Sequence, residues 1–439
     1  MTTTINNKHN KLNFSSEREQ SQACLNSAEH EKNQGRKVLN VPNSTDKGNA
    51  IRNLPNLRFP EFREEWEEHE LSEYLDFKNG LNPKPNQFGK GIKFISVMDI
   101  LNNAVITYDC IRASVSVSEE DISAFSVQKG DILFQRSSET LEDVGRANVY
   151  VDDIPAVFGG FVIRGKQKTN YNPLFFKYLL SSPLARKRII RMGAGAQHFN
   201  IGQEGLSKVK LPFACIDEQN KIAKILYLLD KRISLQNKII EKIQTLIKGI
   251  VDSTILRKEK NAIVGDVCSI SEQIRAEANI DDIITVRLHG NGVCKSSAEN
   301  LQLGATQYYR RRAGQLIYGK QNFHNGAIGI VPISLDNGIT SKDIPSFDID
   351  EMKCNSVYLL AQLQSPQYYK PAEALTTGTG SKRLKEETFL KMPIVLPNKR
   401  EQDNIATLII SISANLDQAK KMLDLFSIQK QYLLRQMFI

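Results

Sequence analysis

The chain has 439 residues, of which 41% are apolar and 24% charged, and its net charge is +9. This length is enough for two or three domains with hydrophobic cores of their own. Six cysteines are scattered without a Cys-x-x-Cys pair, which argues against a zinc site and a disulfide framework and is typical of a reducing cytosol. No apolar run is long enough to span a bilayer, so we expect a cytoplasmic protein. The positive charge suits a polyanionic partner without requiring one.

Residues 1–52 are rich in Asn, Ser, Thr, Lys and Glu and show no hydrophobic periodicity. Such a segment buries too little apolar surface to offset the entropy of ordering, so we expect a disordered N-terminal extension. An alternative is a basic arm that touches DNA, but its charges are mixed, because Lys32, Arg36 and Lys37 lie beside Glu29 and Glu31.

The folded part is expected to start at Leu57–Phe62, which is followed by Trp66. Short β-type runs broken by turns come next. Among them are 92–97, 131–134 and 161–163. The apolar pattern then predicts a helix from Pro173 to about Arg191, followed by a glycine-rich loop at 193–200.

One long helix is predicted from Asp217 to Glu259, where apolar residues recur at steps of three and four and no proline intervenes. This spacing is typical of a coiled-coil seam, and only Gln236 interrupts it. At 1.5 Å per residue the helix would be ~60 Å long. The seam residues are Ile222, Leu226, Leu229, Ile233, Ile240, Ile243, Ile247 and Ile250.

The second half of the chain repeats the first at an offset of 183 residues, which takes Glu218-Gln219 to Glu401-Gln402. A constant offset over such a distance indicates a duplication. The second seam comprises Ile405, Ile409, Ile412, Leu416, Leu423 and Phe426. The other repeated parts are strand-like runs at 283–286 and 315–318, a helix near 357–369 and a second glycine loop at 376–383.

The repeat predicts an α+β protein with an internal pseudo-twofold axis, in which two duplicated globular units are joined by two long antiparallel coiled-coil helices. The expected boundaries are 1–52 for the extension, 53–216 for the first globular unit, 217–260 for the first helix, 261–399 for the second unit and 400–439 for the second helix. The globular units have diverged more than the helices, which suggests two related ligands held on one scaffold.

Three patterns were considered as catalytic signals and rejected. Asn172-Pro173-Leu174-Phe175 resembles the loop with which amino-methyltransferases hold a flipped base, but a helix start explains it better. Glu351-Met352-Lys353 has the spacing of metal-dependent nucleases, yet it lies in an acidic stretch that is typical of a solvated loop. The run Gly378–Lys382 lacks the residue order of a P-loop, and the histidines show no metal-ligand spacing. The sequence therefore predicts neither an active site nor a metal site.

Basic and amide side chains collect after the strand-like runs and in the two glycine loops, and these are the residue types that read base edges or neutralise phosphates. In the first unit the candidates are Gln135, Arg136, Ser137, Ser138, Gln197, His198 and Asn200. In the second unit they are Tyr308, Arg310, Arg311, Arg312, Lys320, Gln321, Asn322, Ser381, Lys382 and Arg383. Any one of them could belong to an ordinary solvated loop, but the paired loops together favour DNA.

These features together resemble the specificity subunits of type I restriction–modification systems. The resemblance rests on Leu57–Pro60 with Trp66, the strand entry Gly130–Leu133, the glycine loops, the Glu-Gln-x-x-Ile-Ala pattern at the head of each long helix, and the ending Leu433–Phe438. It covers residues 57–439, and the first 52 residues lie outside it.

The resemblance implies that each globular unit is an α/β target recognition domain that reads one half of a bipartite DNA target. It further implies that the helices set the spacing and dock two methyltransferase (modification) subunits, which are joined by restriction/translocase subunits. We expect the seam residues to contact both the other long helix and these partner subunits. The chain itself would be non-catalytic and would hold no cofactor, since S-adenosylmethionine, ATP and Mg²⁺ belong to the partners. Two alternatives remain: an orphan two-headed DNA-binding adaptor and a coiled-coil structural protein.

Overall fold

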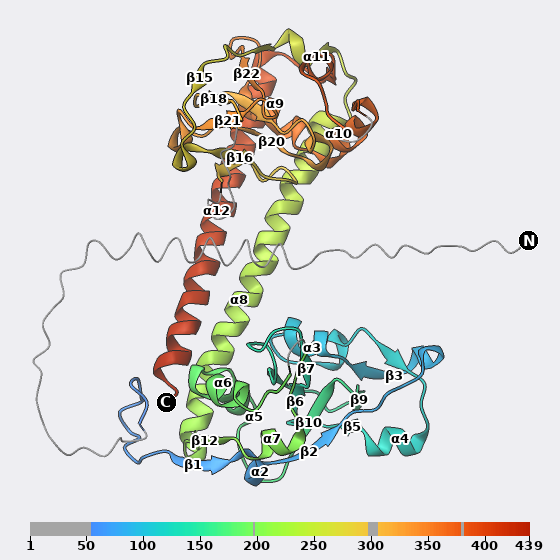
Figure 1. Cartoon of the computed structure of the whole chain (residues 1–439), viewed down its shortest axis with the longest axis vertical. Helices are drawn as coiled ribbons and strands as arrows, with labels where there is room; N and C mark the ends of the chain where they lie inside the picture. Colours follow the sequence, from blue (N-terminus) through green and yellow to red (C-terminus); the bar gives the residue numbers. More distant parts are fainter. Residues whose placement is uncertain (1–53, 196–197, 297–305, 379–381) are drawn as a thin grey trace, which may run out of the picture. The chain divides into compact units, whose positions relative to one another are not determined.

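The computed structural model describes residues 54–195, 198–296, 306–378 and 382–439. The N-terminal extension expected at residues 1–52 lies outside them. Two globular modules, here called the first module (residues 54–215) and the second module (residues 262–398), are connected by the long helices α8 and α12 (Figure 1). Within the described part of the chain, no helix combines the length and apolar character needed to cross a membrane.

The first module is built on two four-stranded sheets, in the orders β2-β10-β6-β8 and β4-β3-β9-β5. The first sheet is antiparallel throughout, and the second contains one parallel pair, β3 with β9. Two small strand pairs, β1 with β12 and β11 with β7, complete the module. The strands are β1 (Glu67–Glu70), β2 (Leu75–Asn79), β3 (Phe88–Ile95), β4 (Ser114–Val115), β5 (Ser126–Val127), β6 (Ile132–Gln135), β7 (Ser137–Ser138), β8 (Ala147–Val149), β9 (Ala156–Phe158), β10 (Val162–Gln167), β11 (Phe199–Asn200) and β12 (Lys210–Phe213).

The helices of the first module include a break that the apolar pattern did not predict. The single helix expected from Pro173 to about Arg191 is two helices, because the Ser182 hydroxyl caps a new start and Pro183 occupies its first turn. The helices are α2 (Leu71–Tyr74), α3 (Val97–Asn102), α4 (Glu119–Ala124), α5 (Pro173–Ser181), α6 (Pro183–Ile190) and α7 (Gln203–Ser207). Short 3-10 turns lie at Pro85–Gln87 and Tyr108–Cys110.

The second module repeats this plan with shorter strands, in sheets ordered β14-β22-β19-β20, β15-β18-β21, β16-β17 and β13-β23. The strands are β13 (Ala262–Ile263), β14 (Cys268–Ile270), β15 (Arg275–Ala276), β16 (Ile284–Val286), β17 (Val293–Lys295), β18 (Tyr308–Arg310), β19 (Leu316–Tyr318), β20 (Ile328–Ile330), β21 (Ile339–Ser341), β22 (Ser346–Ile349) and β23 (Pro393–Ile394). The helices are α9 (Ser356–Leu363), α10 (Pro366–Tyr369) and α11 (Glu386–Leu390), with 3-10 turns at Val264–Asp266, Ile280–Asp282, Phe323–Asn325, Ile333–Leu335 and Lys370–Leu375. The helix expected near 357–369 is thus also broken, at Ser365-Pro366.

Two long helices, α8 (Ile216–Val251) and α12 (Lys399–Gln436), run antiparallel to each other. Their direction follows from the residues that meet: the Gln236 amide donates to the Ala419 carbonyl at 3.0 Å, and Lys430 pairs with Asp230 at 2.6 Å. The α-helix ends at Val251 rather than at Glu259, because the next five residues widen into a π-helix, Asp252–Leu256. At 1.5 Å per residue, α8 is about 54 Å long.

The seam residues divide into two groups. Those near the helix heads are buried in the module cores, where Ile222 and Leu226 of α8 pack into the first module and Ile405 and Ile409 of α12 into the second. Leu229 is also buried. Those farther along are only half-buried between the two helices: Ile233, Ile240, Ile243, Ile412, Leu416, Leu423 and Phe426. In the middle of the pair, each helix therefore packs only along the side that faces the other helix.

The duplication extends to individual hydrogen bonds at the helix heads. The Gln219 side chain accepts from the Asn172 amide at 2.9 Å and donates to the Ala214 carbonyl at 2.9 Å. Gln402 accepts from the Asn355 amide at 2.9 Å and donates to the Pro397 carbonyl at 2.8 Å. Since every partner differs by the same 183 positions, each module is attached to its helix in the same way.

Candidate nucleic-acid interface

The polar loops predicted for the first module meet at one end of its strands, which we call the first tip (residues 135–138, 146, 160–161 and 198–200). Strand β7 pairs with β11, so that Ser137 lies opposite Asn200 and Ser138 opposite Phe199. The Ser137 hydroxyl donates to the Asn200 side-chain oxygen, and the Ile201 amide donates to the Arg136 carbonyl at 2.9 Å. The exposed His198 lies in the same loop. The structure thus brings together candidates that are about 60 residues apart in sequence.

Arg136 is held against the β9–β10 turn. Its amide donates to the Phe161 carbonyl at 2.8 Å, and its guanidinium donates to the Gly160 carbonyl at 3.3 Å. Gln135 is buried and donates from its side chain to the Ser137 carbonyl at 2.9 Å. Gln135 therefore supports the tip from below and does not present its amide to a ligand, which corrects the expectation for this residue.

The second module has a matching second tip (residues 320–322, 342–343 and 382–383). The Leu384 amide donates to the Lys320 carbonyl at 2.9 Å, just as Ile201 donates to Arg136 in the first module. Thr377 and Arg383 pair as Ala194 and Asn200 do. The two tips are therefore the same backbone construction bearing different side chains.

Positive charges at the second tip are held in ion pairs, of which those of Arg383 and Lys382 are exposed. Arg383 pairs with Asp343 at 3.3 Å, Lys382 with Glu373 at 3.4 Å, and Lys320 with Glu386 at 2.6 Å. Exposed pairs of this kind contribute about 0–1 kcal/mol, so Arg383 and Lys382 can exchange their carboxylates for phosphates at little cost. Gln321 and Asn322 are exposed beside them.

The cluster around Tyr308 is only partly available to a ligand. Arg311 is fully buried and donates to the Thr340 hydroxyl at 2.7 Å, the Ser346 hydroxyl at 2.9 Å and the Ile344 carbonyl at 2.9 Å. Burial lowers the pKa of Arg311 to about 10. Tyr308 is buried as well. The expectation that these two side chains face DNA is therefore wrong, because both are buried, Arg311 by the hydrogen bonds of its guanidinium inside the module, whereas Arg310 and Arg312 are exposed.

Two predicted contacts, Gln197 and Ser381, lie outside the described residues. The glycines beside them adopt positive φ, +144° at Gly195 and +129° at Gly378. A Cβ on Gly195 would lie 2.0 Å from the His198 carbonyl oxygen, so only glycine closes this loop. A glycine therefore recurs at this position of both loops because the backbone there has a positive φ.

Arg146 and Phe161 also lie at the first tip, although no pattern in the sequence indicates them. Arg146 reaches the first tip because its carbonyl accepts from the Gln135 amide at 2.7 Å, and its side chain is half-exposed beside Asp143. The other candidates follow strand-like runs or lie in the glycine loops, whereas Arg146 and Phe161 do neither. Only the pairing of β6 with β8 and β10 places them there.

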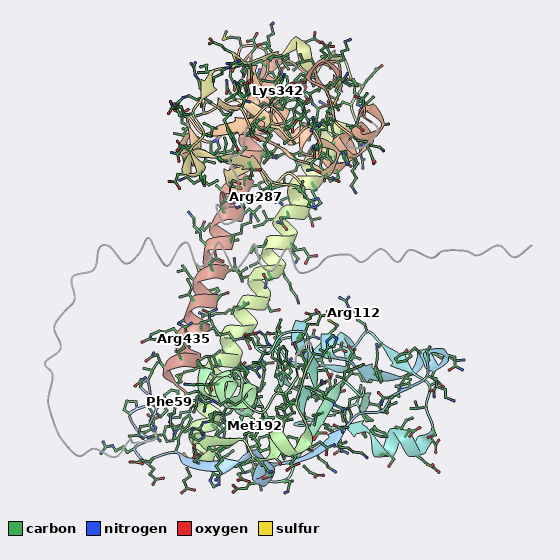
Figure 2. All side chains as sticks on the ribbon, viewed as in Figure 1. Phe59, Arg112, Met192, Arg287, Lys342 and Arg435 are labelled. Atoms are coloured by element: carbon green, nitrogen blue, oxygen red, sulfur yellow. The ribbon has the colours of Figure 1, made fainter. Side chains whose placement is uncertain are left out.

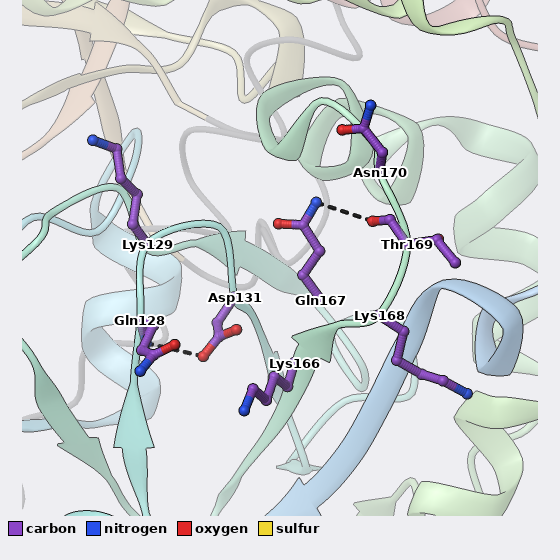
Figure 3. A pocket seen from close by; sticks show the side chains of 8 residues that line it. All are labelled: Gln128, Lys129, Asp131, Lys166, Gln167, Lys168, Thr169 and Asn170. Carbon is purple, nitrogen blue, oxygen red and sulfur yellow. Dashed lines mark hydrogen bonds between the residues drawn. The ribbon is translucent and has the colours of Figure 1, made fainter.

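A hollow of about 360 Å³ lies at the opposite end of strands β6 and β10 (Figure 3). Lys129, Lys166 and Lys168 line it together with Asp131, which accepts from the Gln128 amide at 2.9 Å. Burial raises the pKa of Asp131. Because Asp131 precedes β6 and Gln135 ends it, this hollow is not part of the first tip.

The rejected catalytic patterns have structural roles. The Asn172 side chain caps α5 by accepting from the Phe175 amide at 3.0 Å, and Pro173 occupies the first turn. Asp350 pairs with Lys353 at 3.2 Å in the acidic stretch. The described residues contain no group of three or more His, Cys, Asp or Glu side chains that could hold a metal ion.

A second set of apolar side chains is exposed on the long helices, and in the middle of the helix pair neither module covers the helices (Figure 2). Its members are exposed and distinct from the seam. On α8 they are Ile225, Leu228, Leu235, Ile239 and Leu246, and on α12 they are Leu408, Ile410, Met422, Leu425, Ile428 and Tyr432. Residues 228 and 235, and 239 and 246, are one heptad apart, which is the spacing of a further helix-packing surface. We call this set the outer stripe.

This arrangement defines a class of protein: a scaffold that holds two related, loop-bearing modules at the ends of an antiparallel helix pair. Residues 63–245 match the family described as "Type I restriction modification DNA specificity domain". Over this segment the chain is similar to the specificity subunits of type I restriction–modification systems.

One curated relative and one solved structure are similar to this chain. A Methanocaldococcus jannaschii protein, named as the MjaX type I restriction enzyme specificity subunit, is 28% identical over 204 residues, which are 45% of this chain and 47% of the relative. The match thus spans about half the length of that relative. A crystal structure of a type I restriction–modification S subunit from M. genitalium has a TM-score of 0.58 at 14% identity, covering 88% of this chain and 99% of the other. The fold is therefore that of this S subunit.

Proposed function

We propose that the chain is the DNA-recognition subunit of a type I restriction–modification complex. Each module reads one half of an asymmetric bipartite target, and the partners carry out adenine methylation and restriction. The chain itself is non-catalytic and binds no cofactor, while S-adenosylmethionine, ATP and Mg²⁺ act on the partner subunits. Its location is the cytoplasm.

One observation carries the proposal: the two tips share a backbone construction but differ in side chains. The first tip offers Ser137, Asn200 and Arg136, and the second offers Lys382 and Arg383. Side chains of these types hydrogen-bond to base edges and phosphates. Two copies of one reading device with different chemistry suit a target whose two halves differ.

The helix pair supports a separating role. Each long helix is anchored in one module at its head and in the other at its end, since Met437 and Phe438 at the end of α12 pack into the first module's core. A rigid pair of this kind keeps the two tips at a fixed separation, and so fixes the number of unread base pairs between the half-sites.

The outer stripe supports docking of the two modification subunits. It exposes leucine, isoleucine and methionine at helical spacing along both α8 and α12. Exposed apolar surface of this extent marks an interaction site, and a helix contributed by a partner would cover it in the manner of a bundle. The two helices would provide one such surface for each modification subunit.

The proposal is tested by sequencing methylated adenine in cells that carry the modification subunits, with and without this gene. We expect a bipartite motif, with a fixed number of unread base pairs, that is methylated only when the gene is present. An unchanged methylation pattern in the presence of assembled complex would overturn the proposal. Assembly is checked by co-purification of the modification subunits, and Leu425→Glu on the outer stripe serves as the assembly-deficient control.

A further inference from the structure

Phe161 is the most exposed phenylalanine, tyrosine or tryptophan of the described chain, with 68% of its surface accessible. Scattered exposed apolar residues are normal, but this one lies in the first tip. It occupies the turn that connects β9 to β10, directly beside Arg136.

The backbone at Phe161 is fixed from several sides. The turn is closed by the Val162 amide, which donates to the Gly159 carbonyl at 2.8 Å, and the Phe161 carbonyl accepts from the Arg136 amide at 2.8 Å. A Cβ on Gly160 would lie 2.0 Å from the Asn82 side-chain oxygen, so the preceding residue is packed tightly as well. The aromatic ring thus projects from a rigid support.

Phe161 and Arg136 are neighbours just beyond the end of the β6–β10 ladder. The ladder ends with the pair Gln135 and Val162. Beyond it, the Arg136 amide donates to the Phe161 carbonyl and the Arg136 guanidinium donates to the Gly160 carbonyl. An aromatic ring beside a guanidinium, at the end of a sheet with serine and asparagine neighbours, is the combination that proteins use to hold unstacked bases.

The second module carries different chemistry at the equivalent turn. There the Ile344 amide donates to the Ser341 carbonyl at 3.0 Å, and the Asp343 carbonyl accepts from the Lys320 amide at 2.9 Å. Asp343 therefore occupies the place of Phe161, and its carboxylate pairs with Arg383 at 3.3 Å. The same turn position thus carries the exposed apolar Phe161 in the first module. In the second module it carries Asp343, which orients Arg383.

We propose that Phe161 is a specificity-determining residue of the first module, and that its ring inserts at a base step of the first half-site and stacks on a base. The inference rests on the proposed function and extends it by naming a residue and a mode of contact. Insertion of an apolar side chain unstacks a base step, and its energetic cost depends on the sequence of that step. The first half-site would therefore be read partly through the ease of unstacking, and the second by hydrogen bonds alone.

The test uses the chain assembled with its modification subunits and a duplex carrying the bipartite motif, with 2-aminopurine placed at successive positions of each half-site. For the wild type we expect an increase in 2-aminopurine fluorescence at one step of the first half-site. Phe161→Ala should remove this increase and weaken binding roughly 5- to 100-fold, the range for loss of one base–aromatic stack. Phe161→Leu should fold, bind more weakly than the wild type and also lack the fluorescence increase.

Ile154→Ala is the matched control, because Ile154 is 54% exposed in the same module but follows β8 at the end of the sheet near Asp131, away from the first tip. It should behave as the wild type does. If Phe161→Ala keeps both the wild-type affinity and the fluorescence increase, the inference is wrong while the proposed function stands. If the assembled wild type prefers no sequence over random duplex, the proposed function and this inference fail together.

Discussion

Glu218, near the start of α8, hydrogen-bonds to Arg58 and Trp66 in the segment that precedes β1. We call these three residues the clasp. The Glu218 side chain is fully buried and accepts from the Arg58 guanidinium at 2.7 and 2.8 Å and from the Trp66 indole at 3.0 Å. These hydrogen bonds raise the pKa of Arg58. Glu218→Gln keeps the size of the side chain but removes its charge, so the guanidinium, only 13% exposed, loses its carboxylate.

Breaking a buried pair by removing one partner costs about 3–5 kcal/mol of unfolding free energy. Because the amide oxygen of glutamine still accepts a hydrogen bond, we expect Glu218→Gln to cost about 3 kcal/mol, near the lower end of that range. The duplication supplies the matched control. Glu401 is the residue equivalent to Glu218, but it is 40% exposed and pairs with Lys258 at the surface. Glu401→Gln should therefore cost only about 0–1 kcal/mol.

The assay is urea denaturation followed by far-UV circular dichroism, which reports both modules, and by tryptophan fluorescence, which reports the first module. Trp66 is the only tryptophan of the chain, and since it donates to Glu218, its emission reports unfolding of the module that contains the clasp. Glu218→Gln should lower the midpoint without changing the dependence of the unfolding free energy on urea. Equal losses for the two variants would refute the reasoning, because the burial of Glu218 would then have no energetic consequence.

Three further predictions concern stability, DNA binding and assembly. Asp230→Asn should cost about 3–5 kcal/mol in denaturation, because Lys177 and Lys430 would be left facing each other without a carboxylate. Burial opposes ionisation of Asp230, but the two lysines prevail and lower its pKa. The wild type should therefore lose this contribution as the pH falls below about 4, and the variant should not. Arg312→Ala should reduce the salt dependence of DNA binding by about one phosphate contact without affecting the urea midpoint. Leu425→Glu should prevent co-elution with the modification subunits in gel filtration and leave thermal unfolding unchanged, since this side chain is 60% exposed.

The repeat was the most informative feature of the sequence. The 183-residue offset identifies pairs such as Gln219 and Gln402 whose hydrogen bonds are matched in the structure. Long helices are also readable, because a seam of apolar residues requires only local periodicity. The ends of long helices are harder to predict. After Val251 the hydrogen bonding changes to that of a π-helix, but the apolar pattern continues, so the sequence does not show where the α-helix ends.

Local patterns did not predict which side chains face outward. Arg310, Arg311 and Arg312 are adjacent and chemically identical, yet the middle one is buried, because its guanidinium donates to Thr340, Ser346 and Ile344. Phe161 gave no signal, since an aromatic residue within a β-type run, here 161–163, is usually assigned to the core. In both cases exposure is decided by contacts between distant segments, which spacing along one chain does not encode. The helix breaks at Ser182-Pro183 and Ser365-Pro366 could have been predicted, because a serine followed by a proline is typical of a helix start. The apolar pattern continues across both breaks and therefore predicted one helix in each place.

The measurement that tests the central claim most directly is the methylated motif produced by variants of one tip at a time. Ser137→Ala with Asn200→Ala alters the first tip, and Lys382→Ala with Arg383→Ala alters the second. The account predicts that the first pair relaxes base preference in one half of the motif only, and the second pair in the other half only, with the unread spacing unchanged in both. If both pairs of changes relax the same half, or each relaxes both halves, then the two modules do not read separate half-sites.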